Sequence, residues 1–312
     1  MILVTGANGF VGQAVCAELT RSGKRHVGAV RGGNKRDQVT VGDIDGRTDW
    51  RTALTGCTAV IHLAARVHVM SDTATDPLTR YREVNVEGTL NLARQAVAAG
   101  VKRFVFVSSV KVNGEATPEL PFCASDVPSP QDPYGVSKAE AEQALRQLSA
   151  ETGLEVVVVR PPLVYGPGVK ANFLNLVKLV RRRLPLPFGI RAGYRSMVAL
   201  DNLVDLLIIC TEHPNAANQI FMVSDGVDLT VRDLIEHIGN AIGRPPMLLP
   251  VPIVFMRISA AVLGKAAIAD RLFGALRVDI QATRDRLEWA PVVTPEMAIR
   301  KTVEDYLKVE AR

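Results

Sequence analysis

The chain has 312 residues and a net charge of +5, with 37 lysines and arginines against 32 acidic residues. Hydrophobic residues make up 47% of it and charged residues 22%, which is ordinary for a globular protein and excludes a disordered chain. A chain of this length can bury a sizeable core in one or two domains. The modest positive charge would suit an anionic nucleotide substrate but does not require one.

The four cysteines are Cys16, Cys57, Cys123 and Cys210, and no two of them form a CxxC pair. Their scatter predicts buried thiols and favours neither disulfides nor metal ligands, so we expect no metal site. The first predicted strand begins at residue 1, with no signal-peptide pattern ahead of it. We therefore expect a cytoplasmic protein.

The chain opens with an apolar run, residues 1–5, followed by a turn that contains Gly6, Gly9 and Gly12 and by a helical pattern that ends near Gly23. Strand, glycine turn and helix form the context of a dinucleotide site. Gly6 permits the tight turn, Gly9 lets the backbone approach a pyrophosphate, and Gly12 lets the helix pack on the strand. The helix N-terminus offers unpaired N–H groups to the phosphates. The spacing is GxxGxxG rather than GxGxxG, and a purely structural glycine turn is the alternative.

The second predicted strand, residues 26–30, ends in Arg31, and Lys35 and Arg36 follow closely. An NAD enzyme usually ends this strand with a carboxylate that holds the ribose 2′-hydroxyl, but no carboxylate occurs between residues 19 and 36. A guanidinium can pair with a 2′-phosphate instead. The pattern predicts NADP rather than NAD as the cofactor, with a solvated basic loop as the alternative.

Strands and helices alternate along the next part of the chain. Apolar or β-branched runs predict strands at 58–63, 102–108 and 154–160, and helical patterns predict helices at 87–99 and 133–152. This alternation is typical of an α/β fold with a doubly wound parallel sheet of the Rossmann type. Such sheets bind ligands beyond the carboxyl ends of their strands.

After residue 160 a stretch rich in Pro, Gly and Arg breaks the alternation, one further strand is expected at 218–223, and the remainder has mostly helical patterns. We therefore expect a dinucleotide-binding domain made of residues 1–165 and about 199–225. Residues 166–198 and about 226–312 would form a smaller, mostly helical substrate-binding domain.

Asp132 and Pro133 suit the N-cap and the first residue of the helix predicted at 133–152. Tyr134 and Lys138 then lie four residues apart on one face of it. A lysine ammonium favours the phenolate, so the spacing predicts a lowered pKa for Tyr134. The pair could then exchange a proton with a substrate hydroxyl or carbonyl. An exposed Tyr–Lys pair without chemistry is the alternative.

Several segments resemble one enzyme family, in the same order along the chain. They are residues 5–12, 42–44, 60–65, 85–89, 104–109 and 160–168. Together with Tyr134 and Lys138 they resemble the extended short-chain dehydrogenase/reductase superfamily, in its nucleotide-sugar epimerase, dehydratase and reductase branch. The resemblance covers most of residues 1–202 and is looser beyond them.

The resemblance implies that Ser109, Tyr134 and Lys138 are catalytic. Ser109 would hydrogen-bond the reacting sugar oxygen, Tyr134 would donate or accept the proton, and Lys138 would lower the tyrosine pKa and hold the nicotinamide ribose. Ser108 is the alternative to Ser109, which we prefer because Gly114 follows five residues later, as in the family pattern. The residues that would contact the cofactor, besides Tyr134 and Lys138, are Gly6, Asn8, Gly9, Phe10, Val11, Gly12, Arg31, Asp43, Ile44, Leu63, Ala64, Ala65, Asn85, Val107 and Pro161.

The resemblance also implies contacts with a nucleotide-sugar substrate. Arg195 would clamp the nucleotide diphosphate, a contact that suits a guanidinium. Asn172 would touch the same diphosphate, and Arg271 lies near the expected position of a second arginine. The other predicted substrate contacts are Ser109, Lys111, Leu186 and Phe188, of which Leu186 and Phe188 would pack around uracil. Lys111 replaces a smaller or polar residue of the family, and a solvated lysine is the alternative.

Two reactions of this family compete. An NADP-dependent reductase would transfer hydride to the C4 keto group of a UDP-4-keto-6-deoxy sugar, with Tyr134 giving the proton and Ser109 holding the oxygen. Arg31 favours this reaction, as does a resemblance of residues 108–115 to bacterial reductases of O-antigen polysaccharide biosynthesis. A UDP-sugar 4-epimerase with tightly bound NAD is the alternative. A non-catalytic NADP-binding regulatory protein is a third possibility, which the retained Ser109, Tyr134 and Lys138 disfavour.

The expected partner is a UDP-linked sugar, and nucleic acid is not expected, because Arg181, Arg182 and Arg183 lack interleaved aromatic residues. The resemblance implies a homodimer through the helices that contain Asn85 and Tyr134. The apolar stretch 247–263 has only 17 residues, fewer than a membrane-spanning helix needs. We expect it to cover the substrate site or to form an oligomer contact, with membrane-surface contact as the alternative.

Overall fold

The computed structural model describes residues 1–33, 37–67, 76–117, 119–169, 172–264 and 266–310. Its centre is a seven-stranded sheet in the order β3-β2-β1-β4-β5-β6-β9, in which every neighbouring pair is parallel. The strands are β1 (Ile2–Thr5), β2 (His26–Val30), β3 (Gln38–Thr40), β4 (Ala59–His62), β5 (Arg103–Val107), β6 (Glu155–Arg160) and β9 (Ile220–Met222). The predicted doubly wound sheet is confirmed, including the strand that returns near residue 220. The short edge strand β3 was not predicted.

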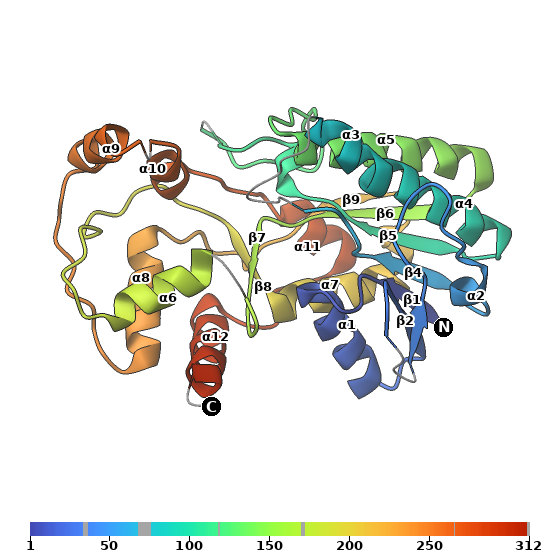
Figure 1. The fold of residues 1–312 in the computed structure, drawn as a ribbon, viewed down its shortest axis with the longest axis horizontal. Coiled ribbons are helices and arrows are strands. Elements are labelled where there is room, and N and C mark those ends of the chain that lie inside the picture. Colours follow the sequence, from blue (N-terminus) through green and yellow to red (C-terminus); the bar gives the residue numbers. More distant parts are fainter. Residues whose placement is uncertain (34–36, 68–75, 118, 170–171, 265, 311–312) are drawn as a thin grey trace.

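Helices cover both faces of this sheet (Figure 1). On one face lie α2 (Arg51–Leu54), α3 (Pro77–Arg82), α4 (Thr89–Ala98) and α5 (Pro133–Thr152), and on the other α1 (Phe10–Arg21), α7 (Leu200–Cys210) and α11 (Gln281–Leu287). The strands alternate accordingly: Leu3 packs with α4 and α5, whereas Ile2 and Val4 pack with α1 and α7. Because both faces of the sheet are buried, its strands are continuous apolar runs, and these runs allowed the strands to be predicted from the sequence.

A second part of the chain is mostly helical, as predicted, and lies beyond one end of the sheet (Figure 1). It has its own core, which joins strands, helices and loops from distant parts of the sequence. Its elements are β7 (Leu163–Tyr165), β8 (Met197–Ala199), α6 (Asn172–Arg181), α8 (Val231–Ile242), α9 (Ile253–Val262), α10 (Ala266–Phe273) and α12 (Pro295–Glu310). β7 and β8 form a separate parallel pair. The domain boundaries given above stay a prediction.

The helix expected at 87–99 is longer and less regular than predicted. It is preceded by a π-helical turn, Glu83–Gly88, that continues from α3. The amide of Asn85 inside that turn bonds both the N–H and the carbonyl of Arg66, at 2.8 and 3.1 Å, and also the hydroxyl of Ser137. π-helical turns within α-helices are frequent at functional sites. None of the helices within the described ranges is long and apolar enough to cross a membrane.

His62, at the end of β4, lies in a buried chain of hydrogen bonds that ties β1 to α4. The Thr5 hydroxyl accepts the backbone N–H groups of Leu63 and Ala64 and therefore directs its own hydrogen to Nδ1 of His62, at 2.7 Å. Nε2 of His62 then donates to the Thr89 hydroxyl at 2.9 Å. Burial, and to a lesser extent the nearby charge of Lys138, lower the pKa of His62 to about 3. The ring is therefore neutral in the folded protein.

The His62 network predicts that stability decreases on acidification. Below pH 6.5 an unfolded histidine binds a proton, whereas the folded ring does so only near pH 3, so the unfolded state gains protons first. We expect the free energy of unfolding to fall between neutral pH and about pH 5 with a His62 contribution of up to about 1.4 kcal/mol per pH unit. Urea unfolding of wild type and His62→Gln measures this slope, which should be smaller in the variant. His237→Gln on α8 is the control, and an equal slope in wild type and His62→Gln would contradict the assignment.

Candidate active site

The glycine turn has a geometry that only glycine satisfies. Gly6 adopts a φ of 65°, and its carbonyl accepts the N–H of Gly9 at 2.8 Å. A Cβ at Gly12 would lie 2.1 Å from the carbonyl oxygen of Gly6. Gly9 is the N-cap of α1 and has no side chain to cap the helix, so the cap residue itself does not occupy the first N–H groups. Such a cradle fits the pyrophosphate of a dinucleotide.

The loop after β4 lies against this turn. A Cβ at Gly6 would meet the backbone nitrogen of Ala64 at 3.0 Å, and Thr5 binds both Leu63 and Ala64 as described above. Among the other residues predicted there, Asn8 accepts a hydrogen bond from Gln38, and Phe10 and Val11 are packed on the core beneath the turn. Ala65 follows in the same loop. The structure thus brings the predicted cofactor contacts of β1 and β4 together at the carboxyl edge of the sheet, where the strand order reverses.

Arg31 follows β2 at the same edge and is 82% exposed. Its guanidinium lies 3.7 Å from the carboxylate of Asp43, which is 90% exposed. An ion pair so open to water contributes little, so it leaves Arg31 available to another anion. Ile44 packs toward Gly88 and the core, which places residues 42–44 beside the π-helical turn. Lys35 and Arg36 lie outside the described residues.

The two candidate serines have different surroundings. Ser108 is buried and donates to Glu142 at 2.5 Å. Ser109 is half-buried, and its hydroxyl oxygen accepts only a backbone N–H, that of Lys111, among the bonds recorded for the described residues. The backbone carbonyl of Pro161 accepts the N–H of Val110 and so holds the Ser109 turn against the end of β6. The surroundings favour Ser109 as the serine that can meet a substrate.

Tyr134 and Lys138 lie in the first turns of α5, as predicted, because Asp132 caps this helix through the N–H of Gly135 and Pro133 begins it. Lys138 is 2% exposed and donates to the carbonyl of Val107 at 2.8 Å, at the end of β5. A Cβ at Gly135 would lie 2.8 Å from the carbonyl oxygen of Lys111. These contacts bring the start of α5 against the Ser109 turn and the carboxyl end of β5.

The prediction that Lys138 lowers the pKa of Tyr134 is wrong for this arrangement. Burial raises the pKa of Tyr134 well above its usual range, and the negative charge of Asp132 raises it further. The Lys138 ammonium lies over the ring of Phe106, at 4.4 Å, and 6.0 Å from the centre of the Tyr134 ring. Burial also lowers the pKa of Lys138 itself to about 7, against the opposing charge of Glu142. Removal from water therefore sets the direction of the Tyr134 pKa shift, and Tyr134 holds its proton at neutral pH.

Lys111 is not placed as a free cation for a substrate phosphate. Its ammonium forms ion pairs with Glu115, at 3.0 Å, and with Asp132. Asp132 is also the N-cap of α5, so this half-buried cluster holds the helix start that carries Tyr134. The sequence left two alternatives for Lys111, contact with the substrate or a solvated side chain. The structure favours a third role, in which Lys111 positions the start of α5.

A buried polar network behind Ser109 was not predicted. Arg160 and Glu142 are 1% and 0% exposed and form a two-pronged ion pair at 3.0 and 2.6 Å. Glu142 also accepts from Ser108, and Arg160 donates to Asn113 at 3.0 Å. The signal available in the sequence was Glu142 four residues after Lys138, on the same face of the helix, together with an arginine at the end of an otherwise apolar strand.

The predicted substrate residues of the second part are partly brought together. The backbone of Arg195 pairs with Leu229 and its guanidinium donates to the carbonyl of Gly274 at 3.1 Å, just beyond the end of α10. Phe188 lies 6.3 Å from Phe273 between ring centres. Leu186 is buried and packs in the core of this part. Asn172 begins α6 and Arg271 lies in α10, but their side chains lie outside the described part of the structure.

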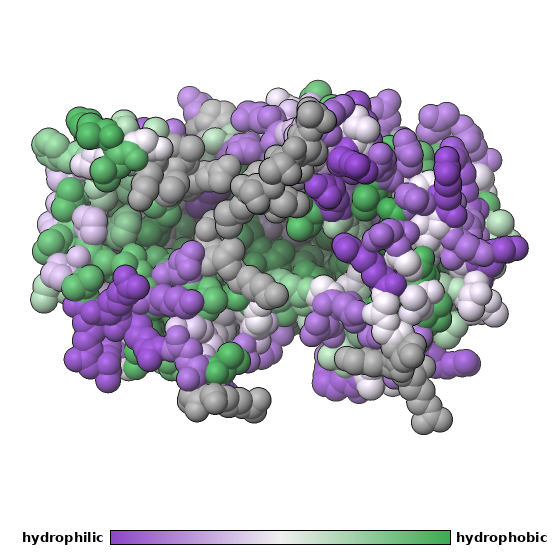
Figure 2. All heavy atoms as spheres, in the orientation of Figure 1, coloured by the Kyte–Doolittle hydropathy of each residue, from purple (hydrophilic) through white to green (hydrophobic). Residues whose placement is uncertain are grey.

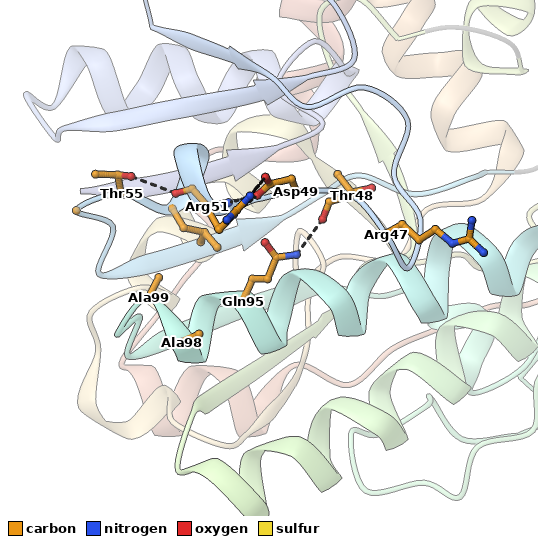
Figure 3. A pocket seen from close by; sticks show the side chains of 10 residues that line it. Arg47, Thr48, Asp49, Arg51, Thr55, Gln95, Ala98 and Ala99 are labelled. Atoms are coloured by element: carbon orange, nitrogen blue, oxygen red, sulfur yellow. Dashed lines mark hydrogen bonds and ion pairs between the residues drawn. The ribbon is translucent and has the colours of Figure 1, made fainter.

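A cavity elsewhere on the sheet is not part of this site. It has a volume of about 790 Å³ and lies between α2 and the last turns of α4 (Figure 3). Gly56 and Ala99, which line it, precede β4 and β5, so the cavity is at the amino ends of these strands. The carboxylate of Asp49 in it is already bound by Arg51, at 2.6 Å. Ligands of doubly wound sheets bind at the opposite edge.

The burial of the Glu142–Arg160 pair predicts that removing one charge lowers the free energy of unfolding more than removing both. Glu142→Gln leaves a buried guanidinium without its counter-charge and should lower the free energy of unfolding by about 3 kcal/mol. Replacing both residues by leucine should cost less than Glu142→Gln alone, because no buried charge remains.

Urea unfolding of the two variants tests this expectation. Glu296→Gln is the matched control, since Glu296 also pairs with an arginine on a helix but is 62% exposed, and its loss should cost under about 1 kcal/mol. Equal decreases in the free energy of unfolding for Glu142→Gln and Glu296→Gln would show that the buried pair stabilises the fold no more than an exposed pair does.

Comparison with known proteins agrees with this geometry. The model of the NAD dependent epimerase/dehydratase family matches residues 2–223. A Vibrio cholerae protein described as a UDP-glucose 4-epimerase is 46% identical over 317 residues, which cover 100% of this chain and 97% of that protein. The solved structure of a UDP-glucose 4-epimerase from Thermotoga maritima with UDP-glucose has 24% identity and a TM-score of 0.77 over 99% of both chains.

A second solved structure, RMD from Pseudomonas aeruginosa complexed with NADPH, has 23% identity and a TM-score of 0.76 over 99% of this chain and 97% of that chain. At these identities the two solved structures establish a shared fold. The family match and the Vibrio relative extend to the sequence segments that form the glycine turn, the Ser109 strand and the start of α5. The chain therefore belongs to the NAD-dependent epimerase/dehydratase family and is an enzyme of the extended short-chain dehydrogenase/reductase type that works with NAD or NADP.

Proposed function

We propose that this protein is a UDP-sugar 4-epimerase, which inverts the configuration at C4 of the sugar. The observation that carries the proposal is the convergence of the Ser109 turn and the Tyr134 turn of α5 at the sheet edge that also holds the glycine turn. The similarity to the Vibrio UDP-glucose 4-epimerase, at 46% identity over the full chain, supports epimerisation over the reduction that the sequence favoured.

The roles of the residues follow from their chemistry. The chemistry that a bound dinucleotide would supply is reversible hydride exchange with C4 of the sugar. The glycine turn and the start of α1 would hold the pyrophosphate. The Ser109 hydroxyl would hydrogen-bond the sugar O4. The positive charge of a bound oxidised nicotinamide would favour the Tyr134 phenolate, which would take the O4 proton and later return it. Lys138, bound to the Val107 carbonyl, would reach the ribose beside them. Arg195, Asn172 and Arg271 would bind the diphosphate.

A second candidate is the NADP-dependent reduction of a UDP-4-keto sugar. Two observations favour it: the exposed Arg31 stands where NAD enzymes carry a carboxylate, and burial keeps Tyr134 protonated, as a proton donor requires. A homodimer stays a prediction from the resemblance, and a cytoplasmic location stays a prediction from the sequence.

The first experiment identifies the nucleotide that the purified protein holds. We expect denaturation to release about one NAD per chain, and the native protein to interconvert UDP-glucose and UDP-galactose without added cofactor. Protein that is empty, binds NADPH far more tightly than NADH and oxidises it only when a UDP-4-keto-6-deoxy sugar is supplied would replace the epimerase by the reductase. Absence of both activities, together with NADP binding, would support the non-catalytic alternative.

Removing the Tyr134 hydroxyl tests the proton transfer. Tyr134→Phe should lower kcat by about 10²–10⁴-fold while the protein stays folded and keeps its nucleotide, since general acid–base catalysis contributes an effect of this size. Tyr81→Phe is the matched control: its ring lies 6.1 Å from that of Tyr134, but its hydroxyl has only a 3.5 Å contact with the carbonyl of Val67 among the bonds recorded for the described residues. A Tyr134→Phe enzyme as active as Tyr81→Phe would remove Tyr134 from the mechanism.

A further inference from the structure

Helix α9 turns its apolar face outward. Its half-buried residues, Ile253, Met256 and Ala260, recur at three- and four-residue spacing and form the face that lies against the protein. No residue of the helix is fully buried. The opposite face is apolar and exposed, with Val254 at 65%, Phe255 at 62%, Ile258 at 56% and Val262 at 81%. A surface helix normally shows the reverse arrangement, with polar residues toward water.

The loops that precede this helix extend the same surface. Leu186 pairs with the segment 247–249 through two backbone hydrogen bonds, of 2.9 and 2.8 Å, so the two loops lie side by side. Both expose large apolar side chains. Together with α9 they form what we call the α9 patch: Leu184, Met247, Leu249, Val254, Phe255, Ile258, Val262 and Leu263, each between 44% and 81% exposed. Figure 2 shows apolar surface gathered over α9 at the upper left of the molecule.

The charged side chains of α9 and of the two loops beside it are all positive. Residues 182–191 and 244–263 contain five arginines and no aspartate or glutamate. Arg182, Arg183 and Arg244 are exposed, and the two loops place them within a few residues of the patch. Arg257 is half exposed and lies 3.8 Å from Asp270, a separation at which an exposed pair contributes little. An apolar face bordered by arginines is complementary to a surface that is apolar inside and anionic outside.

We propose that the α9 patch binds the surface of an anionic phospholipid bilayer, with α9 lying in the plane of the interface. Its ten residues are too few to span a bilayer but enough to place a row of apolar side chains among the acyl chains. A second copy of this chain fits the patch less well, because two copies would bring Arg182, Arg183 and Arg244 of each chain together, and the segments that carry these arginines contain no acidic residue. The proposal concerns a surface outside the candidate active site and does not depend on which reaction the enzyme catalyses.

Vesicle sedimentation with the full chain tests this inference. We expect the protein to sediment with vesicles of equal parts phosphatidylcholine and phosphatidylglycerol, to bind phosphatidylcholine vesicles much more weakly, and to be released by salt. Phe255→Ser and Ile258→Ser should each weaken the partition constant by about tenfold through lost apolar burial. Arg244→Gln should weaken it by about fivefold. The matched control is Val127→Ser, which removes an 86% exposed apolar side chain outside the patch and should bind like wild type.

The variants distinguish bilayer binding from a folding defect and from dimerisation. Because the substituted side chains are exposed, all variants should keep the thermal midpoint and the activity of the wild type toward a soluble substrate. Failure of the wild-type protein to bind the mixed vesicles would overturn the proposal. So would equal binding by wild type and Phe255→Ser. A dimer in solution that Phe255→Ser dissociates, with no effect of vesicles, would replace the bilayer by a second copy of the chain.

Discussion

An ion pair that is almost completely removed from water, Glu142 with Arg160, joins the helix that carries Tyr134 and Lys138 to the strand beside the Ser109 turn. Glu142 lies one turn beyond Lys138 on α5, and Arg160 is the last residue of β6. Charges buried in this way hold their partners in one geometry, because any displacement leaves a charge without compensation. Ser108 and Asn113 bond to the same pair, so the segment around Ser109 is fixed from behind. The relative placement of the three candidate catalytic residues depends on this contact.

The glycine turn depends on a second constraint, the close approach of β1 and β4. Thr5 uses its single hydroxyl to bind two backbone N–H groups and the His62 ring, and Gly6 has no side chain to separate the two loops. The first constraint acts on β6 and the second on β1 and β4, which are strands of the same sheet. As a result, the cradle for a dinucleotide and the serine–tyrosine–lysine cluster form at a single edge, although more than a hundred residues of sequence separate Gly6 from Tyr134.

Burial rather than charge dominates the electrostatics of this edge. Lys138, Tyr134 and His62 all have pKa values shifted in the direction that disfavours the charged form. The cluster is therefore close to neutral, with Asp132 and Lys111 paired at its border. The opposite situation holds at the α9 patch, where apolar side chains and arginines face outward. The candidate active site thus disfavours the charged forms of its buried side chains. The distant α9 patch instead exposes arginines and apolar side chains together.

The parallel sheet, the glycine turn, helix α5 with its cap and the Tyr134–Lys138 spacing were all predictable from the sequence, because local patterns encode them: apolar runs for strands buried on both faces, glycines at a turn, and an Asp-Pro start of a helix. Only the tertiary structure decided that Ser108 faces Glu142, that Lys111 is held by Asp132, and that burial raises the pKa of Tyr134. These properties depend on which side chains distant segments bring into contact and on how far water is excluded there, and a single sequence does not encode either quantity locally. For the same reason, the sequence did not decide the role of the apolar run 247–263. Its composition is the same whether its apolar side chains pack inward or, as in α9, face outward.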